Sequence, residues 1–396
     1  MEMSPEKLEF IQKNAPCYLY DKNQIIEQCK LLRSFLPDEI ILYSVKTNPF
    51  APVLQSIAAR GFGADAASAN EVLRAVNTGI KADRIFYSAP GKTIEDIEKV
   101  WGKCIVIADS FSELDMLESY GEARNEEIHV GIRVNPAFSM NGSIAGPSKF
   151  GVDEERITPE TVNFPHLKIV GIHVHLQSQI LDTDMLCEYY RNCYALAERI
   201  NGRVNGEISF INFGSGLGTV YDASKEKALD LEKIGKIMQE LQHRNQQSLH
   251  ARFIVETGRF LVCNAGTYYT KVVDRKESRG KTYIVVQNAL NGFLRPAIAE
   301  LLRQNLGEFP RVGQEPLYTS AGQCSFHILG KEADVEKVDV VGNLCTSLDV
   351  MAKDILLPHA VKGDVLEVTN AGSYGCTLTP QLFSGQEAAR EFLWEE

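Results

Sequence analysis

Short apolar segments alternate with longer amphipathic segments from about residue 16 to residue 265. The apolar segments have the continuous hydrophobic character of strands that are buried on both faces of a sheet. These predicted strands are Ile40–Val45, Arg84–Tyr87, Cys104–Ala108, His129–Val134, Ile169–His173, Ser209–Phe213 and Phe253–Val255. The amphipathic segments predict helices, of which the clearest are Ala51–Arg60, Ser68–Thr78, Ile94–Trp101, Ser112–Tyr120 and Asp184–Ile200. Strands that alternate with helices in this way predict an α/β fold with a parallel sheet.

The number and spacing of these units favour a closed (β/α)8 TIM-like barrel, because about eight of them fit into roughly 250 residues. An open, doubly wound sheet is the alternative architecture. That architecture usually carries a Gly-rich turn after its first strand. Here the first strand is followed instead by Lys46-Thr47-Asn48, so the barrel fits the chain better.

The pattern changes after residue 266, where β-rich segments are separated by turn residues and helical segments are few. The β-rich segments are Thr267–Asp274, Thr282–Gln287, Val338–Val341 and Val365–Thr369. They predict a separate C-terminal antiparallel β-domain. We therefore expect the barrel to span residues 16–265, and the β-domain to comprise residues 266–396 together with residues 1–15.

Composition excludes several classes of protein. The formal net charge of −11 argues against a nucleic-acid surface, where Lys and Arg cluster. No apolar run approaches the roughly 18 residues of a membrane span, and Met1–Phe10 lacks the apolar core of a signal peptide. The nine cysteines include no CxxC pair, which argues against a disulfide framework or a zinc knuckle. We expect a cytoplasmic protein that binds neither membrane nor nucleic acid.

Lys46 is the first candidate for chemistry, because it directly follows the first predicted strand. Barrel enzymes place their reactive groups at the C-terminal ends of the strands. Partial desolvation there would lower the pKa of the amine and make it a Schiff-base nucleophile. The alternative is an ordinary lysine that faces solvent, so this residue decides nothing alone.

Three further strand ends carry polar groups. His173 and His175 point the same way from a strand. This arrangement suits one imidazole stacked on a flat ring. It suits a metal site less well, since no nearby acid or cysteine completes a ligand set. We expect a structural role for His173. The turn Gly214-Ser215-Gly216 exposes backbone N–H groups that can cradle a phosphate, or is only a tight connection. Glu256 and Arg259 could form a structural ion pair. Alternatively, the acid could pair with a pyridinium nitrogen and the arginine could bind a phosphate.

The segment Tyr43-Ser44-Val45-Lys46-Thr47-Asn48 resembles the Y-x-x-K-x-N motif of fold-type III pyridoxal-phosphate (PLP) decarboxylases. This group includes the ornithine, arginine and diaminopimelate decarboxylases. The resemblance covers nearly the whole chain. It continues through Gly63-Ala64-Asp65-Ala66-Ala67-Ser68, Pro90-Gly91-Lys92, Arg133-Val134-Asn135-Pro136, Lys149-Phe150-Gly151, Gly342-Asn343-Leu344-Cys345 and Ala371-Gly372-Ser373-Tyr374-Gly375.

The resemblance implies an alanine-racemase-like barrel that binds PLP, with Lys46 linked to the cofactor as a Schiff base. It implies that His175 stacks on the cofactor ring with Ser178 close by, and that Glu256 pairs with the pyridine nitrogen. It assigns the phosphate to Gly214, Ser215, Gly216, Arg259 and Tyr374. Cys345 would return a proton to Cα. Because relatives build the site at a dimer interface, Cys345 and Tyr374 would come from the neighbouring subunit of an obligate homodimer.

The chain departs from the family's motifs at four positions. Ser215 replaces the middle glycine of a Gly-Gly-Gly turn, Thr257 replaces proline, and Gln177 replaces glycine. Thr346 stands directly after Cys345, where relatives that act on diamino acids have an acidic residue that binds the distal ammonium. An uncharged residue cannot offset a buried ammonium, which argues against lysine, ornithine or diaminopimelate as substrate.

The Leu-Cys-Thr sequence and the segment Asn135–Gly151 resemble decarboxylases of siderophore and antibiotic assembly, which act on amino acids whose side chain bears an acyl group such as citryl. Arg295 and His327 would then meet a carboxylate-bearing tail. We therefore predict decarboxylation of an acylated amino acid. The alternatives are a diaminopimelate- or ornithine-type decarboxylase of a free amino acid, an amino-acid racemase on the same fold, and a non-catalytic regulator.

Overall fold

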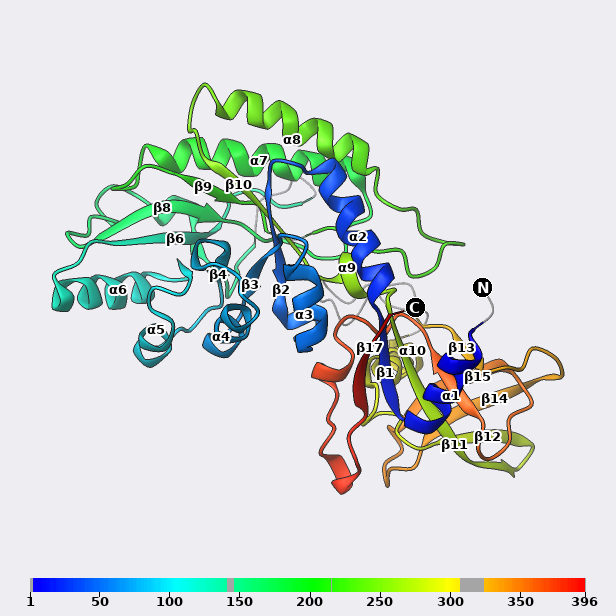
Figure 1. The fold of residues 1–396 in the computed structure, drawn as a ribbon. Coiled ribbons are helices and arrows are strands. Elements are labelled where there is room, and N and C mark those ends of the chain that lie inside the picture. The colour runs from blue at the N-terminus through cyan, green and yellow to red at the C-terminus, as the bar shows by residue number, and fades with distance from the viewer. Residues whose placement is uncertain (1–2, 141–145, 215, 307–323, 396) are drawn as a thin grey trace. The chain divides into compact units, whose positions relative to one another are not determined.

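The computed structural model describes residues 3–140, 146–214, 216–306 and 324–395 (Figure 1). The chain divides into two compact units. One unit, the barrel unit, comprises Ile26–Gly218 and Ala228–Gly258. The other, the β-unit, comprises Met1–Ile25, Thr219–Lys227 and Arg259–Glu396.

Eight parallel strands of the barrel unit form a closed ring, in which the last strand pairs with the first. In order around the ring they are β2 (Ile40–Ser44), β3 (Gly63–Ala66), β4 (Ile85–Tyr87), β5 (Ile105–Ala108), β6 (Ile128–Asn135), β8 (Leu167–His173), β9 (Phe210–Asn212) and β10 (Arg252–Thr257). The short β7 (Val152–Asp153) pairs with β6 outside the ring. The predicted closed barrel is therefore confirmed.

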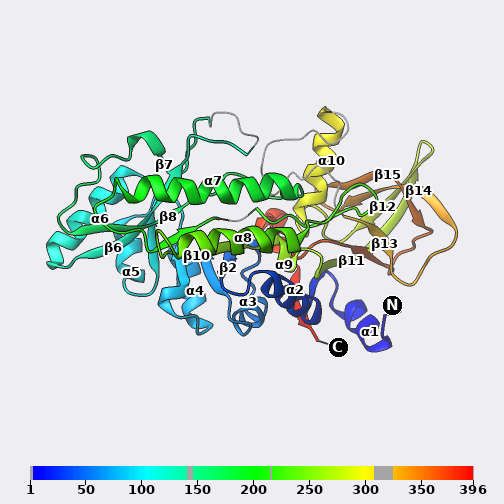
Figure 2. The same cartoon turned by 90° about the horizontal axis from the view of Figure 1, so that it is seen from above.

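The helices between the strands follow their capping residues. They are α2 (Lys22–Phe35), α3 (Ala51–Ala58), α4 (Ala69–Asn77), α5 (Ile94–Val100), α6 (Phe111–Arg124), α7 (Thr183–Asn201) and α8 (Leu231–Asn245). Ser68, Thr93 and Ser110 each accept a hydrogen bond from a backbone N–H of the first turn, which fixes where α4, α5 and α6 begin. Helices α7 and α8 run side by side in both views (Figures 1 and 2). Between β6 and β8 the described residues contain only β7 and a single 3-10 turn, Glu154–Arg156.

The inside of the barrel holds a hydrophobic cluster that includes the aromatic side chain of Phe210. Phe210 packs with Leu42, Phe86, Ile107 and Ile254, all of which are buried. A Cβ on Gly171 would lie 2.3 Å from this ring. Strand β8 therefore has a glycine where the barrel interior has no room for a side chain.

Gly171→Ala is expected to lower the free energy of unfolding by about 1–3 kcal/mol, because the added methyl group overpacks the barrel against Phe210. The measurement is the midpoint of urea unfolding. Gly202→Ala is the matched control, since a Cβ on Gly202 would meet nothing within 4 Å. Equal midpoints for the two variants would contradict this account of the barrel interior.

The β-unit is a mostly antiparallel sheet. Its strands are β1 (Cys17–Asp21), β11 (Gly266–Ser278), β12 (Lys281–Val286), β13 (Phe326–Ile328), β14 (Val335–Gly342), β15 (Val350–Pro358), β16 (Val365–Val368) and β17 (Arg390–Trp394). The main path runs β13-β16-β11-β12-β14-β15, and β1 pairs with β11 and β17. Among the described strand pairings of the β-unit, only β12–β14 and β1–β17 are parallel. The helices of this unit are α1 (Pro5–Asn14), α9 (Arg259–Val262) and α10 (Leu294–Leu306).

The two units differ from the expected boundaries of 16–265 and 266–396 with 1–15. Strand β1 belongs to the β-unit because its backbone pairs with β11 and β17, although its apolar sequence looks like that of a barrel strand. Residues 219–227 and 259–265 also belong to the β-unit. The hydrophobic pattern shows that a strand is buried, but it does not show which sheet the strand joins.

No helix among the described residues is both long enough and apolar enough to cross a lipid bilayer.

Candidate active site

The candidate residues of the barrel unit lie at the ends of five neighbouring strands. In ring order β3 carries Asp65, Lys46 follows β2, β10 carries Glu256, Asn212 ends β9 and His173 ends β8. Parallel strands bring their carboxyl ends to one rim of a barrel. Four of these strand ends, those of β2, β8, β9 and β10, were expected to carry chemistry, and the closed ring places them side by side.

Lys46 lies in a 3-10 turn, Val45–Thr47, directly after β2. Its Nζ is 3.2 Å from Asp65 Oδ2, and Ser88 Oγ donates a 2.6 Å hydrogen bond to the other oxygen, Asp65 Oδ1. Burial raises the pKa of Asp65, but the Lys46 ammonium and the Ser88 hydroxyl outweigh it, so this pKa lies below its ordinary value. The Lys46 side chain is 48% exposed and is therefore about half-buried.

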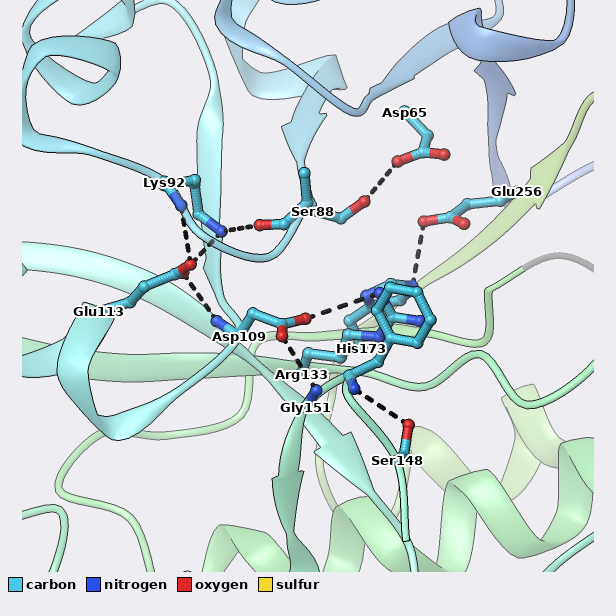
Figure 3. Close-up of polar contacts among 12 residues, drawn as sticks. Asp65, Ser88, Lys92, Asp109, Glu113, Arg133, Ser148, Gly151, His173 and Glu256 are labelled. Atoms are coloured by element: carbon cyan, nitrogen blue, oxygen red, sulfur yellow. Dashed lines mark hydrogen bonds and ion pairs between the residues drawn. The ribbon is translucent and has the colours of Figure 1, made fainter. Parts of the chain in front are cut away.

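Glu256 is a buried carboxylate with two partners. Asn212 Nδ2 donates a 2.8 Å hydrogen bond to Glu256 Oε1. His173 Nε2 lies 3.3 Å from the same oxygen (Figure 3). Burial and Asp65 raise the pKa of Glu256, whereas His173 and Lys46 lower it, and the net pKa is lower than usual. His173 therefore contacts this carboxylate.

His175 lies beyond the end of β8, and its Nε2 is 3.2 Å from Ser178 Oγ. Burial, and after it the positive charge of Arg133, lower the pKa of His175 to about 3. The ring is therefore neutral at physiological pH. A neutral imidazole beside Glu256 can offer its face to a flat aromatic ligand without adding a charge.

The glycine turn after β9 is crowded. Gly214 has φ +66°, and a Cβ there would lie 2.2 Å from Val174 O and 2.9 Å from His175 Cβ. The amide of Gly214 already donates to Asn212 Oδ1 at 2.9 Å, so this residue provides the shape of the turn rather than a free donor. Among the described residues no acceptor is found for the amide of Gly216, and Ser215 lies outside the described residues.

A buried group of charged side chains comes from the segments after β4 and β5, from β6 and from α6 (Figure 3). Lys92 Nζ is 2.7 Å from Glu113, whose carboxylate also accepts the backbone N–H of Asp109 at 2.9 Å. Asp109 Oδ1 is 3.6 Å from Arg133 Nη1, and the Arg133 guanidinium lies 4.3 Å from the Phe150 ring centroid. These contacts hold Arg133 in one orientation, and its charge acts on His175. The family motifs contain Lys92, Arg133 and Phe150, but no role was predicted for these residues.

Sequence reasoning also missed Asp65 and Asn212. Both are polar residues within short apolar segments, and that was the available signal. A buried polar residue in a strand requires a partner, but the sequence does not identify the partner.

The β-unit contains the other predicted residues. Arg259 begins α9, is only 5% exposed, and donates through Nη1 to the Tyr221 hydroxyl. Its guanidinium lies 5.3 Å from the Tyr374 ring centroid. Tyr374 has φ +51°, a left-handed conformation that is unusual for a tyrosine. Tyr221 was not predicted from the sequence.

Arg295 lies in the first turn of α10 and is only 4% exposed. Its Nη1 donates to Ser373 O at 2.9 Å and to Asn370 O at 3.3 Å, which fixes the turn that precedes Tyr374. Its Nε is buried without a hydrogen-bond partner among the described residues. Arg295 can therefore both hold this turn and donate to an anion.

The remaining predicted residues are more accessible. His327 is exposed on β13, opposite Glu367. Cys345 is a free, exposed thiol, and Thr346 is half-buried beside it. The turn that carries them is closed by Asp349, whose Oδ2 accepts the amide of Leu344 at 2.8 Å. Cys345 belongs to the β-unit, whereas Lys46 belongs to the barrel unit.

Comparison with known proteins agrees with this geometry. Residues 22–263 match the family described as "Pyridoxal-dependent decarboxylase, pyridoxal binding domain". The chain is 31% identical over 395 residues to an L-glutamyl-[BtrI acyl-carrier protein] decarboxylase of Niallia circulans, covering 96% of this chain and 88% of that protein. It is 29% identical over 375 residues to a diaminopimelate decarboxylase of Aquifex aeolicus, covering 92% and 83%.

Among solved structures, diaminopimelate decarboxylase from Helicobacter pylori complexed with L-lysine is 25% identical, with a TM-score of 0.81 over 98% of this chain and 94% of that one. The family match covers more than half of the chain and the barrel of the structure. The resemblance inferred from the sequence motifs is therefore confirmed, and the chain belongs to the family of PLP-dependent amino-acid decarboxylases.

Proposed function

We propose that this decarboxylase removes the α-carboxylate of an amino acid whose side chain carries an acyl group, such as citryl, or is linked to a carrier protein. The observation that carries the proposal is the turn around Cys345. Its only acid, Asp349, is buried and accepts the backbone amides of Leu290 and Leu344, both at 2.8 Å. Thr346 provides no charge. The turn therefore has no free carboxylate for the distal ammonium of a diamino acid.

The relative from Niallia circulans, whose name describes a glutamyl group on an acyl-carrier protein as its substrate, supports this proposal. The other candidate is decarboxylation of free diaminopimelate or ornithine. It is favoured by the relatives named as diaminopimelate decarboxylases. A role in siderophore biosynthesis is part of the first proposal.

The residues present fit PLP. Two buried groups have no hydrogen-bond partner among the described residues: Nη2 of Arg259 and the hydroxyl of Ser373. Buried donors without acceptors are costly, and a phosphate can satisfy them. Gly214 has no side chain, and a Cβ at this position would collide with Val174 and His175. The backbone beside His175 is therefore not covered by a side chain of residue 214. These features match the phosphate and the flat ring of the cofactor.

Bound PLP supplies a ring that accepts the electrons released when the carboxylate leaves. We propose that Lys46 binds the cofactor aldehyde through its amine. Glu256, ionised because its pKa is low, holds a proton at the ring nitrogen. Neutral His175 stacks on the ring, and Ser178 orients this imidazole through Nε2.

We further propose that Gly216, Ser215, Arg259 and Tyr374 bind the phosphate, and that Gly214 shapes the turn. Arg295, His327 and Thr346 are proposed to meet the substrate side chain. An exposed thiol at Cys345 is suited to deliver a proton to the substrate Cα from a second copy of the chain. The enzyme is accordingly proposed to be a homodimer with shared active sites.

We propose the cytoplasm as the location. The nine cysteines are free thiols, which is typical of a reducing compartment.

The substrate proposal is tested by release of carbon dioxide from purified enzyme. The panel compares citryl- and carrier-linked amino acids with free lysine, ornithine and diaminopimelate. We expect kcat/KM for one acylated substrate to exceed that for every free diamino acid by at least about tenfold, because an unpaired buried ammonium is costly. Faster release from a free diamino acid would contradict the proposal.

Thr346→Glu sharpens this test, since it places a carboxylate after Cys345. It is expected to raise kcat/KM for free diamino acids relative to acylated ones. Ser347→Glu, at an exposed neighbouring position, is the control for added charge. The chirality of recovered substrate, measured in the same assay, distinguishes decarboxylation from racemisation.

A further inference from the structure

Two buried arginines of the β-unit lie close to the same tyrosine. The Tyr221 hydroxyl accepts a hydrogen bond from Arg259, and two backbone carbonyls accept from Arg295. Arg259 Nη2 and Arg295 Nε are buried without hydrogen-bond partners among the described residues. Two buried positive charges without a carboxylate are unfavourable until anions neutralise them. The arrangement therefore suits the binding of two anionic groups.

Tyr221 connects the two arginines. Its ring centroid is 5.7 Å from Arg259 Cζ and 5.6 Å from Arg295 Cζ, distances typical of cation–π contacts. Its hydroxyl accepts a hydrogen bond from Arg259 Nη1. Tyr221 thus contacts both guanidiniums, and the Tyr374 ring lies against Arg259 as well.

The backbone around Tyr221 is also held in place. The amide of Tyr221 donates to Glu226 Oε2 at 2.8 Å, and Asn264 Nδ2 donates to Val220 O at 3.3 Å. Burial, followed by the nearby Cys263 thiol, raises the pKa of Tyr221 to about 12, while both arginines oppose this shift. The phenol therefore stays neutral and does not neutralise either arginine.

We propose that Tyr221 is a positioning residue that sets Arg259 for the cofactor phosphate and Arg295 for a negatively charged group on the substrate side chain. This inference rests on the proposed function and specifies the substrate class: an amino acid whose acyl tail is negatively charged. Arg295 Nη1 is occupied by Asn370 O and Ser373 O, so the tail binds through Nε. A carboxylate suits this edge of a guanidinium.

The first test measures binding without turnover. Tyr221→Phe keeps the ring and removes the hydroxyl, and it is expected to weaken PLP binding to the apoenzyme by about tenfold, because a hydrogen bond to a charged group is lost. It should also reduce the thermal stabilisation of the apoenzyme by inorganic phosphate. Tyr20→Phe is the matched control, because Tyr20 is a buried tyrosine of the same unit that donates to Glu391 Oε1 at 2.7 Å.

The second test compares two acylated substrates that differ only in the tail, one ending in a carboxylate and the other in a carboxamide. Tyr221→Phe at saturating PLP should raise KM severalfold for the carboxylate and change kcat less than KM. Tyr221→Leu, which removes the ring too, should enlarge this difference.

The outcomes separate the two proposals. If Tyr221→Phe resembles Tyr20→Phe in changing only the melting temperature, Tyr221 is merely structural and the inference is overturned. An equal rise in KM for both tails overturns the assignment of Arg295. If the wild-type enzyme decarboxylates neither substrate, the proposed function falls, whereas weakened PLP and phosphate binding by Tyr221→Phe still supports the positioning of Arg259.

Discussion

Lys46→Ala is expected to lower the rate of carbon dioxide release by about 10^4-fold or more, the range seen when a covalently acting residue is removed. The amine stands directly after β2, is 48% exposed, and is held by Asp65 at 3.2 Å. It is therefore accessible to an aldehyde and already oriented. The measurement is the decarboxylation rate with saturating PLP and substrate.

Lys46→Arg is the matched control for charge. It retains a cation for Asp65, so the buried carboxylate keeps a partner, but a guanidinium does not form a Schiff base under these conditions. We expect the same loss of activity with a smaller loss of stability. Borohydride reduction followed by mass spectrometry should find the cofactor on Lys46 in the wild-type enzyme. A reduced adduct on another lysine would refute the assignment.

Glu256→Gln is expected to lower kcat by about 10^2-fold or more, comparable to removing one electrostatic contact at a developing charge. The amide has a similar shape and can still accept from Asn212, but it cannot hold a proton at the ring nitrogen. PLP affinity should change much less than kcat. A variant with kcat within a few fold of the wild-type value would contradict this role.

Glu118→Gln is the control, because Glu118 lies on α6 and accepts the His166 amide at 2.9 Å at the surface of the barrel unit. The pH dependence gives a second check. A lowered carboxyl pKa means that Glu256 remains ionised until the pH falls below the ordinary range for glutamate. Loss of activity between neutral pH and about pH 5 should therefore not come from Glu256.

The two variants act on separate contacts of one rim. The positive charge of Lys46 lowers the pKa of both Asp65 and Glu256. Their effects on rate are accordingly expected to be less than additive, since either loss stops the same reaction. The double variant should be only slightly slower than Lys46→Ala alone.

The barrel itself was predictable because its strands are buried on both faces. Continuous apolar runs mark such strands whatever their neighbours, and seven of the eight ring strands were recognised in this way. The eighth, Gly63–Ala66, is short and contains Asp65, so its hydrophobic signal is weak. In the β-unit β13, β15 and β17 were missed, because half-buried or short strands alternate less clearly. The buried strand β1 was missed as well.

The amino-acid sequence by itself determined the fold class, the lysine that follows the first strand, and the family to which the motifs belong. Only the tertiary structure decided which polar groups meet: Asp65 with Lys46, Asn212 and His173 with Glu256, and Tyr221 with both arginines. The physical reason is that hydrophobicity and local motifs are properties of a segment. Partners across a sheet are set by ring closure and strand register, which join residues far apart in the chain.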